Sequence, residues 1–97
     1  MSMASTGDTL TRIIEITNKK GLHARASAKF VQTVERFDAQ VKVTRGSETV
    51  GGDSIMGLMM LAAGPGTSIK IETSGADAAR AMEAICELVG SRFGEED

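Results

Sequence analysis

The sequence predicts a single α+β domain in which three helices cover one face of a four-stranded antiparallel sheet. Apolar and polar residues alternate at 10–17, 39–44 and 67–73, as they do in half-buried strands. At 24–37 and 78–89 apolar residues recur at spacings of three and four, as they do in amphipathic helices. A chain of 97 residues fits one domain, and right-handed crossovers would place all the helices on the same face of the sheet.

Turn signals separate the strands. Residues 18–21 form a turn after the first strand, and residues 45–47 form a tight turn from the second strand into a short third strand that ends near Val50. The residues expected to face the core are Leu10, Ile14 and Ile16 in the first strand, Val41 and Val43 in the second, and Ile69 and Ile71 in the fourth.

The helices are bounded in a similar way. The first is expected over residues 24–37, with Asp38 closing it, and the last follows Asp77 as its N-cap. Residues 55–62, IMGLMMLA, form a short apolar helix between them. The expected apolar stripes are Ser27, Phe30, Val31, Val34 and Phe37 in the first helix and Ala78, Ala81, Met82, Ile85, Leu88 and Val89 in the last. The resulting order, β-α-β-β-α-β-α, leaves the strand order open, because a ferredoxin-like fold shares most of it.

Composition disfavours several classes of protein. With 11 basic and 13 acidic residues the net charge is −2, and three Phe without Tyr or Trp leave little for bases to stack on, so nucleic-acid binding is not expected. No stretch approaches the ~20 apolar residues of a membrane span. The N-terminus, MSMASTGDTLTR, lacks the apolar region of a secretory signal, so a cytoplasmic location is expected.

The ends of the chain and its single thiol add little chemistry. Residues 1–8 and 93–97 are expected to be flexible, and residues 95–97 to form a solvated acidic tail. Cys86 is the only cysteine, so it cannot form an internal disulfide, and one thiol makes no metal site. No metal and no cofactor are expected.

His23 is the only histidine, so any histidine chemistry must take place there. A lone histidine would ordinarily be a helix cap or a surface residue. Here it directly precedes the first helix, where unpaired N–H groups and the positive end of the helix dipole attract anions. The N–H groups of Ala24 and Arg25 would point at the ring, and the dipole would favour its neutral, nucleophilic form. The Arg25 guanidinium could grip phosphate oxygens with two N–H bonds.

Nothing in the sequence looks like a complete enzyme, because there is no GxxxxGK[ST] nucleotide loop and no legible Ser-His-Asp triad. Residues 21–31, GLHARASAKFV, resemble the active-site motif of HPr, the histidine-containing phosphocarrier of the bacterial phosphotransferase system, and the resemblance covers roughly residues 10–90. It implies an open-faced β-sandwich with strand order 1-4-2-3. It also implies a phosphoryl group on Nδ1 of His23, with Arg25 as the family arginine.

The same resemblance implies partners. The donor would be enzyme I, itself phosphorylated from phosphoenolpyruvate, the acceptors would be EIIA proteins, and the chain would be a monomer, as most of the family are. Two positions depart from the family pattern. Ala26 replaces the usual proline, which would loosen the first helical turn. Glu35 stands where sugar-transport members tend to be basic. The resemblance therefore fits the nitrogen-related branch, which is often regulatory, at least as well as the sugar-transport branch.

Residues 51–61, GGDSIMGLMML, form a second informative segment, in which Ser54 is expected to be the N-cap of the short helix. The segment resembles the regulatory serine region of HPr, which implies phosphorylation of Ser54 by an HPr kinase/phosphorylase. A phosphate at a helix N-terminus is tolerated electrostatically. It would add negative charge where a partner docks.

The short helix cannot bury every side. If Leu58, Leu61 and Ala62 face the sheet, the remaining apolar side chains lie exposed. An exposed apolar patch suggests a partner surface, and methionine adapts to partners of different shape. The predicted partner-docking residues are Ile55, Met56 and Met59.

Two other functions compete with the carrier. The first is a regulatory binding module controlled through Ser54, in which His23 is secondary; a pure binding module, however, needs no arginine-flanked histidine at a helix end. The second is a small nucleic-acid-binding domain of similar topology, which the net charge and the aromatic count disfavour.

Overall fold

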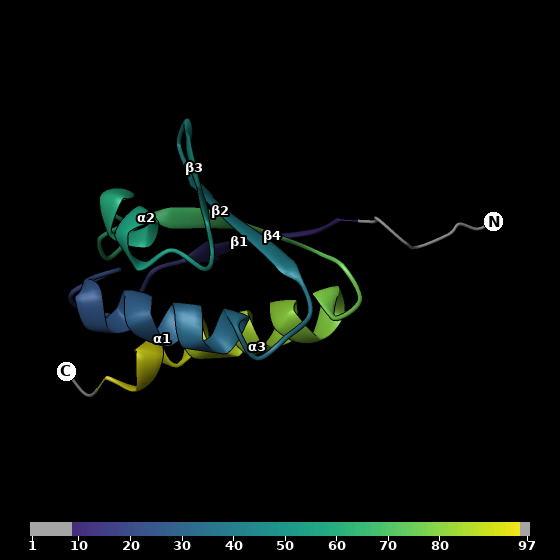
Figure 1. Cartoon of the computed structure of the whole chain (residues 1–97). Helices are drawn as coiled ribbons and strands as arrows, with labels where there is room; N and C mark the ends of the chain where they lie inside the picture. Colours follow the sequence, from purple (N-terminus) through teal and green to yellow (C-terminus); the bar gives the residue numbers. More distant parts are fainter. Residues whose placement is uncertain (1–8, 96–97) are drawn as a thin grey trace.

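The computed structural model describes residues 9–95 (Figure 1). The elements in this range are β1 (Leu10–Glu15), α1 (Ala24–Val34), β2 (Gln40–Arg45), β3 (Glu48–Gly51), α2 (Ile55–Met60), β4 (Ser68–Ser74), α3 (Ala78–Gly90) and a turn of 3-10 helix, η1 (Arg92–Gly94). The predicted order is confirmed, and η1 is an addition to it. The flexibility expected for residues 1–8, 96 and 97 concerns residues outside the described range.

The sheet has the order β1-β4-β2-β3, and every neighbouring pair of strands is antiparallel. This is the α+β, open-faced β-sandwich that the resemblance implies. In Figure 1, α1 and α3 run side by side along one face of the sheet. The short helix α2 packs against α1 and β3. The opposite face is open, since Ile13 of β1 is 73% exposed.

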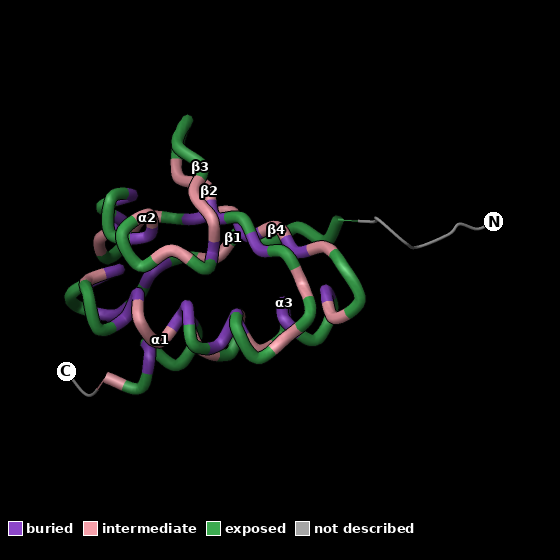
Figure 2. The backbone as a smooth tube through the Cα atoms, viewed as in Figure 1, coloured by how far each residue is buried: buried purple, intermediate pink, exposed green. Residues whose placement is uncertain are grey.

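The core lies between the sheet and the helices. The alternating residues Val41, Val43, Ile69 and Ile71 are buried as predicted, and they form one cluster with Phe30 of α1 and further apolar residues of the helices. Figure 2 shows the buried positions recurring along the side of α1 that faces the sheet. Burying a large apolar side chain stabilises the folded state by about 1.5–3 kcal/mol. The alternating apolar positions therefore determine which face of each strand the helices cover.

The first helix ends earlier than the sequence predicts, at Val34 instead of Phe37. After Val34 the N–H groups of Arg36 and Phe37 bond to carbonyl groups only three residues back, at 3.2 Å each, which tightens the chain out of the α-helix. The Phe37 ring leaves the stripe, and the guanidinium carbons of Arg36 and Arg80 lie 5.2 and 5.6 Å from its centroid.

Two residues expected to be in the core are exposed. Leu10 is 39% exposed, because it begins an edge strand that the helices cover only in part. Ala62 is exposed and has a φ of 52°, in the left-handed region, where the chain leaves α2. Leu58 and Leu61 are buried as predicted.

Asp77 takes the predicted N-cap position of α3, but its side chain makes no cap bond to that helix. Its Oδ2 instead accepts a hydrogen bond from the N–H of Asp38 at 2.8 Å. The N–H of Asp77 donates to the carbonyl oxygen of Asp38 at 2.9 Å. This reciprocal pair joins the start of α3 to the loop before β2.

The chain turns back onto the fold after α3. Arg92, Phe93 and Gly94 have φ values of 58°, 57° and 74°, so the backbone is left-handed at three residues in a row. The turn buries Phe93, which is 1% exposed, in the core cluster. Phe93 is therefore part of the core, and the expectation of a solvated tail is wrong for Glu95, whose side chain is 18% exposed. Within residues 9–95, no helix is long and apolar enough to cross a bilayer.

Candidate functional site

The loop before α1 is held in place by the segment that follows α2. Gly21 has a φ of 62°, which favours glycine, and a Cβ at this position would collide with the carbonyl oxygen of Ala63. The N–H of Leu22 donates to that same oxygen at 3.0 Å. Because the loop is fixed to the segment after α2, the point where α1 begins is fixed as well.

His23 occupies the N-cap position of α1, as predicted. Its carbonyl oxygen accepts the first helical hydrogen bond, from the N–H of Ser27 at 2.8 Å, while its side chain makes no cap bond. The Ser27 hydroxyl donates to the carbonyl oxygen of Leu22 at 3.2 Å and ties the first turn to the loop. The ring is thus left for other contacts, and the N–H groups of Ala24 and Arg25 have no acceptor within the helix.

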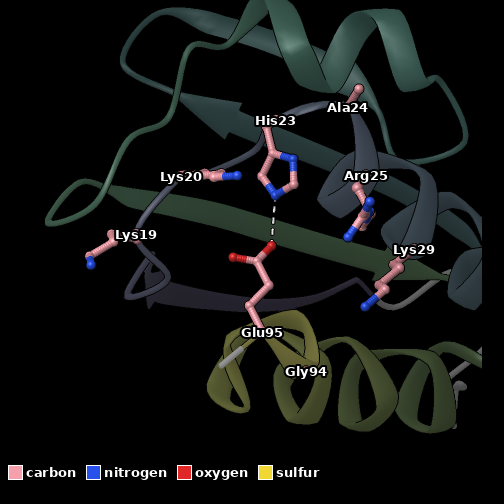
Figure 3. A pocket seen from close by; sticks show the side chains of 8 residues that line it. All are labelled: Lys19, Lys20, His23, Ala24, Arg25, Lys29, Gly94 and Glu95. Atoms are coloured by element: carbon pink, nitrogen blue, oxygen red, sulfur yellow. Dashed lines mark hydrogen bonds and ion pairs between the residues drawn. The ribbon is translucent and has the colours of Figure 1, made fainter. Parts of the chain in front are cut away.

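A pocket of about 590 Å³ opens beside the ring of His23 (Figure 3). The predicted site residues His23, Ala24 and Arg25 come together here, whereas Ser54 and the predicted docking residues do not line this pocket. Its other lining residues are Lys19, Lys20, Lys29, Gly94 and Glu95. Four cationic side chains around one histidine suit an anionic group such as a phosphoryl.

Glu95 contacts His23 directly. Its Oε2 lies 2.6 Å from Nε2 of the ring, and the two side chains are 18% and 26% exposed. Its Oε1 accepts a hydrogen bond from Nδ2 of Asn18 at 3.2 Å, and the same Nδ2 donates to the carbonyl oxygen of Gly21 at 2.9 Å. The hydrogen bond with His23 is the main cause that lowers the pKa of Glu95; Asn18 and the charges of His23 and Lys29 add to it, and burial opposes it.

Lys29 holds the same C-terminal segment at a second point, because its Nζ donates to the carbonyl oxygen of Phe93 at 2.7 Å. Arg25 is different. It is exposed, and its guanidinium has no hydrogen-bond or ion-pair partner among residues 9–95, so it is available to an incoming anion.

Sequence reasoning missed the four other charged residues of this pocket, and Gly94 with them. Lys19 and Lys20 fall in the predicted turn, Lys29 lies in the predicted first helix outside its apolar stripe, and Glu95 falls in the predicted tail. The sequence does carry one signal for the last of these, since the apolar Phe93 beyond α3 is unusual in a solvated tail. Within the described part of the chain, no group of three or more His, Cys, Asp or Glu side chains could hold a metal ion.

Ser54 lies at a separate place, the N-terminus of α2. Its Oγ accepts a hydrogen bond from the N–H of Gly57 at 2.9 Å, which confirms the predicted N-cap. The predicted docking side chains beside it are exposed, and Met60 joins them. The exposed fractions are 40% for Ile55, 70% for Met56, 40% for Met59 and 70% for Met60.

Comparison with known proteins agrees with this geometry. Residues 10–91 match the family model described as "PTS HPr component phosphorylation site". The phosphocarrier protein HPr of Neisseria meningitidis serogroup A is 57% identical over 86 residues, which cover 89% of this chain and 97% of that protein. The phosphocarrier protein NPr of Shewanella violacea is 41% identical over 86 residues, 89% of this chain and 94% of that protein. A crystal structure of HPr from Thermoanaerobacter tengcongensis aligns with a TM-score of 0.87 at 42% identity, over 91% of this chain and 99% of that one. The chain therefore belongs to the HPr family, the phosphocarrier proteins of the phosphotransferase system.

Proposed function

We propose that this chain carries a phosphoryl group on Nδ1 of His23, which it accepts from enzyme I and passes to EIIA proteins. The observation that carries the proposal is a single, half-buried histidine at the start of α1, in a pocket lined by Lys19, Lys20, Arg25 and Lys29. We place this exchange in the cytoplasm, with the chain acting as a monomer.

The transfer needs positioning and charge more than acid–base chemistry. The lone pair of Nδ1 forms a bond to phosphorus while the bond from phosphorus to the donor breaks, and that electron pair stays with the donor. The phosphoryl oxygens then meet the unpaired N–H groups of the first helical turn and the guanidinium of Arg25, which can form two parallel bonds. Transfer to the acceptor reverses these steps.

The test uses the full chain with enzyme I and radiolabelled phosphoenolpyruvate. We expect the wild type to take up label as a phosphohistidine that is labile in acid and stable in base. His23→Ala should take up none, while Gln32→Ala, an exposed position of α1, should match the wild type. Labelling of His23→Ala to the wild-type level would overturn the proposal.

The exposed apolar face of α2 supports the proposal that partner proteins dock on this helix. Ile55, Met56 and Met59, with Met60 beside them, are the docking residues that we assign to enzyme I and the EIIA proteins. Ser54 lies at the start of the same helix. A phosphate there, added by an HPr kinase/phosphorylase, would place roughly two negative charges next to this patch.

Two substitutions at Ser54 distinguish the effect of helix capping from the effect of added negative charge. Asp and Asn both cap helices well, but only Asp adds a charge. We expect Ser54→Asp to slow phosphoryl acceptance from enzyme I, and Ser54→Asn to leave it unchanged. Equal rates for the two variants would contradict regulation by charge and leave Ser54 as a cap.

A further inference from the structure

We propose that Glu95 is a positioning residue for phosphoryl transfer: its carboxylate keeps the ring proton of His23 on Nε2, so that Nδ1 presents its lone pair to phosphorus. The inference rests on the proposed carrier function. It assigns separate tasks to the two ring nitrogens, one holding the proton and the other forming the bond.

The contact itself dictates the proton's place. A carboxylate can only accept hydrogen bonds, so Nε2, at 2.6 Å from Oε2 of Glu95, must be the donor. In a neutral imidazole the other nitrogen then carries the lone pair, and the partner of one nitrogen sets the state of the other. In Figure 3 this second nitrogen lies on the side of Ala24 and Arg25, away from Glu95.

The carboxylate is held from several directions. Asn18, which is fully buried, donates to Oε1 of Glu95 and also to the loop that carries His23. Lys29 binds the carbonyl oxygen of Phe93, and the Phe93 ring is buried in the core. A left-handed backbone at Arg92 and Phe93 is strained and persists only where the surroundings hold it. The contact is therefore built into the fold at both of its ends.

Glu95 also suits the product of the step. When Nδ1 bonds to phosphorus and the donor keeps the electron pair of the broken bond, no proton enters or leaves the ring. The ring keeps its proton on Nε2 and gains a positive charge, which faces the Glu95 carboxylate directly. Because this charge forms during transfer, the carboxylate stabilises the transition state more than the ground state.

The experiment compares Glu95→Ala with Glu87→Ala, an exposed glutamate of α3, in the full chain. Nitrogen NMR of the His23 ring above neutral pH reports where the proton resides. We expect it on Nε2 alone in the wild type and in Glu87→Ala. In Glu95→Ala a fraction should move to Nδ1, and the Nε2 proton should exchange faster with water.

Phosphoryl acceptance from phosphorylated enzyme I gives a second readout. We expect kcat to fall about tenfold in Glu95→Ala, the lower end of the loss seen when the partner that orients a metal-binding histidine is removed. KM for enzyme I should stay unchanged because docking is not affected. Glu95→Asp, which keeps the charge, should recover part of the rate. A merely structural role would not produce this recovery.

The two proposals fail in different ways. If Glu95→Ala keeps the wild-type tautomer and rate while His23→Ala takes up no label, the positioning role is overturned and the carrier function stands. If His23→Ala takes up label, the carrier function is overturned, and the inference that rests on it is overturned too. Loss of the Nε2 proton's protection in Glu95→Ala, together with the slower transfer, would support both.

Discussion

Nε2 of His23 and Oε2 of Glu95 lie 2.6 Å apart although 72 residues separate them along the chain. The contact connects the first residue before α1 to the first residue after η1, and it brings a carboxylate into a pocket lined by four cationic side chains. The negative charge offsets part of the mutual repulsion of these cations while no phosphoryl is bound. The site therefore depends on both ends of the fold.

The titration of Glu95 should report this contact. The hydrogen bond with His23 is the main cause that lowers the pKa of Glu95, so in His23→Ala this pKa should rise toward its ordinary value. A lowered pKa in the folded state means that the contact stabilises the protein above the unfolded value, about 4.3 for glutamate. That stabilisation is lost as the pH falls through the folded value. Carbon NMR of the Glu95 carboxyl group measures both midpoints, and equal midpoints would contradict the prediction.

Phe93 should be essential for keeping Glu95 in place. Replacing a fully buried phenylalanine with alanine costs about 3–5 kcal/mol of unfolding free energy, and Phe93 is 1% exposed. Phe93→Ala should therefore lower stability in urea and also abolish the lowered pKa of Glu95. Phe37→Ala is the matched control, because Phe37 is partly exposed and loses mainly its contacts with Arg36 and Arg80, worth about 1 kcal/mol. Equal losses in the two variants would be inconsistent with this account.

The sequence predicts most of the local structure because the signals are local. Val41 with Val43 and Ile69 with Ile71 alternate because neighbouring residues of a strand point to opposite faces. Alternation describes each strand by itself, however, so the strand order came only from the family resemblance. The helix at 24–37 was predicted too long because Phe37 has helical spacing, while the backbone after Val34 tightens into turns that spacing does not reveal.

The residues of the candidate site also divide into those that a local motif predicts and those that only the tertiary fold brings in. His23, Ala24 and Arg25 are neighbours in the sequence, so a motif that precedes a helix is enough to find them. Glu95 joins them only through a tertiary contact that the buried Phe93 ring makes possible, and the one sequence signal for this contact is the apolar Phe93 itself. Lys29 lies outside the apolar stripe predicted for the first helix, and its side chain binds the returning C-terminal segment.

Replacing Gly21 with alanine should destabilise the protein more than its backbone angle alone suggests. Gly21 and Gly46 share a φ of 62°, but a Cβ at Gly21 would collide with the carbonyl oxygen of Ala63, whereas at Gly46 nothing lies within 4 Å. Gly46→Ala should cost only the left-handed strain, about 1–2 kcal/mol. Gly21→Ala should cost more and should also slow phosphoryl acceptance, because the loop before His23 must move. Urea unfolding and the labelling rate test this, and similar losses at both glycines would refute the role of the collision.

Ser54 should contribute to stability independently of any modification. Its Oγ accepts the N–H of Gly57 at 2.9 Å, and removing a serine N-cap costs about 1 kcal/mol. Ser54→Ala should lose about this much unfolding free energy, while Ser54→Asn, which can accept the same bond, should lose a few tenths at most. Urea denaturation of the three proteins distinguishes the cases. A fully stable Ser54→Ala would show that the bond contributes nothing in solution.

The exposed side of α2 should determine partner affinity. Six large apolar residues are exposed among residues 9–95, and four of them lie on this one short helix: Ile55, Met56, Met59 and Met60. If enzyme I docks there, Met56→Ala should raise its Kd about tenfold, the cost of truncating an interface residue that contributes more than about 1 kcal/mol.

Ile13 provides the control for this experiment. It is 73% exposed against 70% for Met56, but it lies on the open face of the sheet, in β1. Ile13→Ala removes a comparable apolar side chain from the surface, so it should leave the Kd unchanged. Titration calorimetry with enzyme I measures both values. Equal weakening by the two variants would show that enzyme I responds to surface apolarity in general, and an effect of Ile13→Ala alone would move the docking surface from α2 to the open face of the sheet.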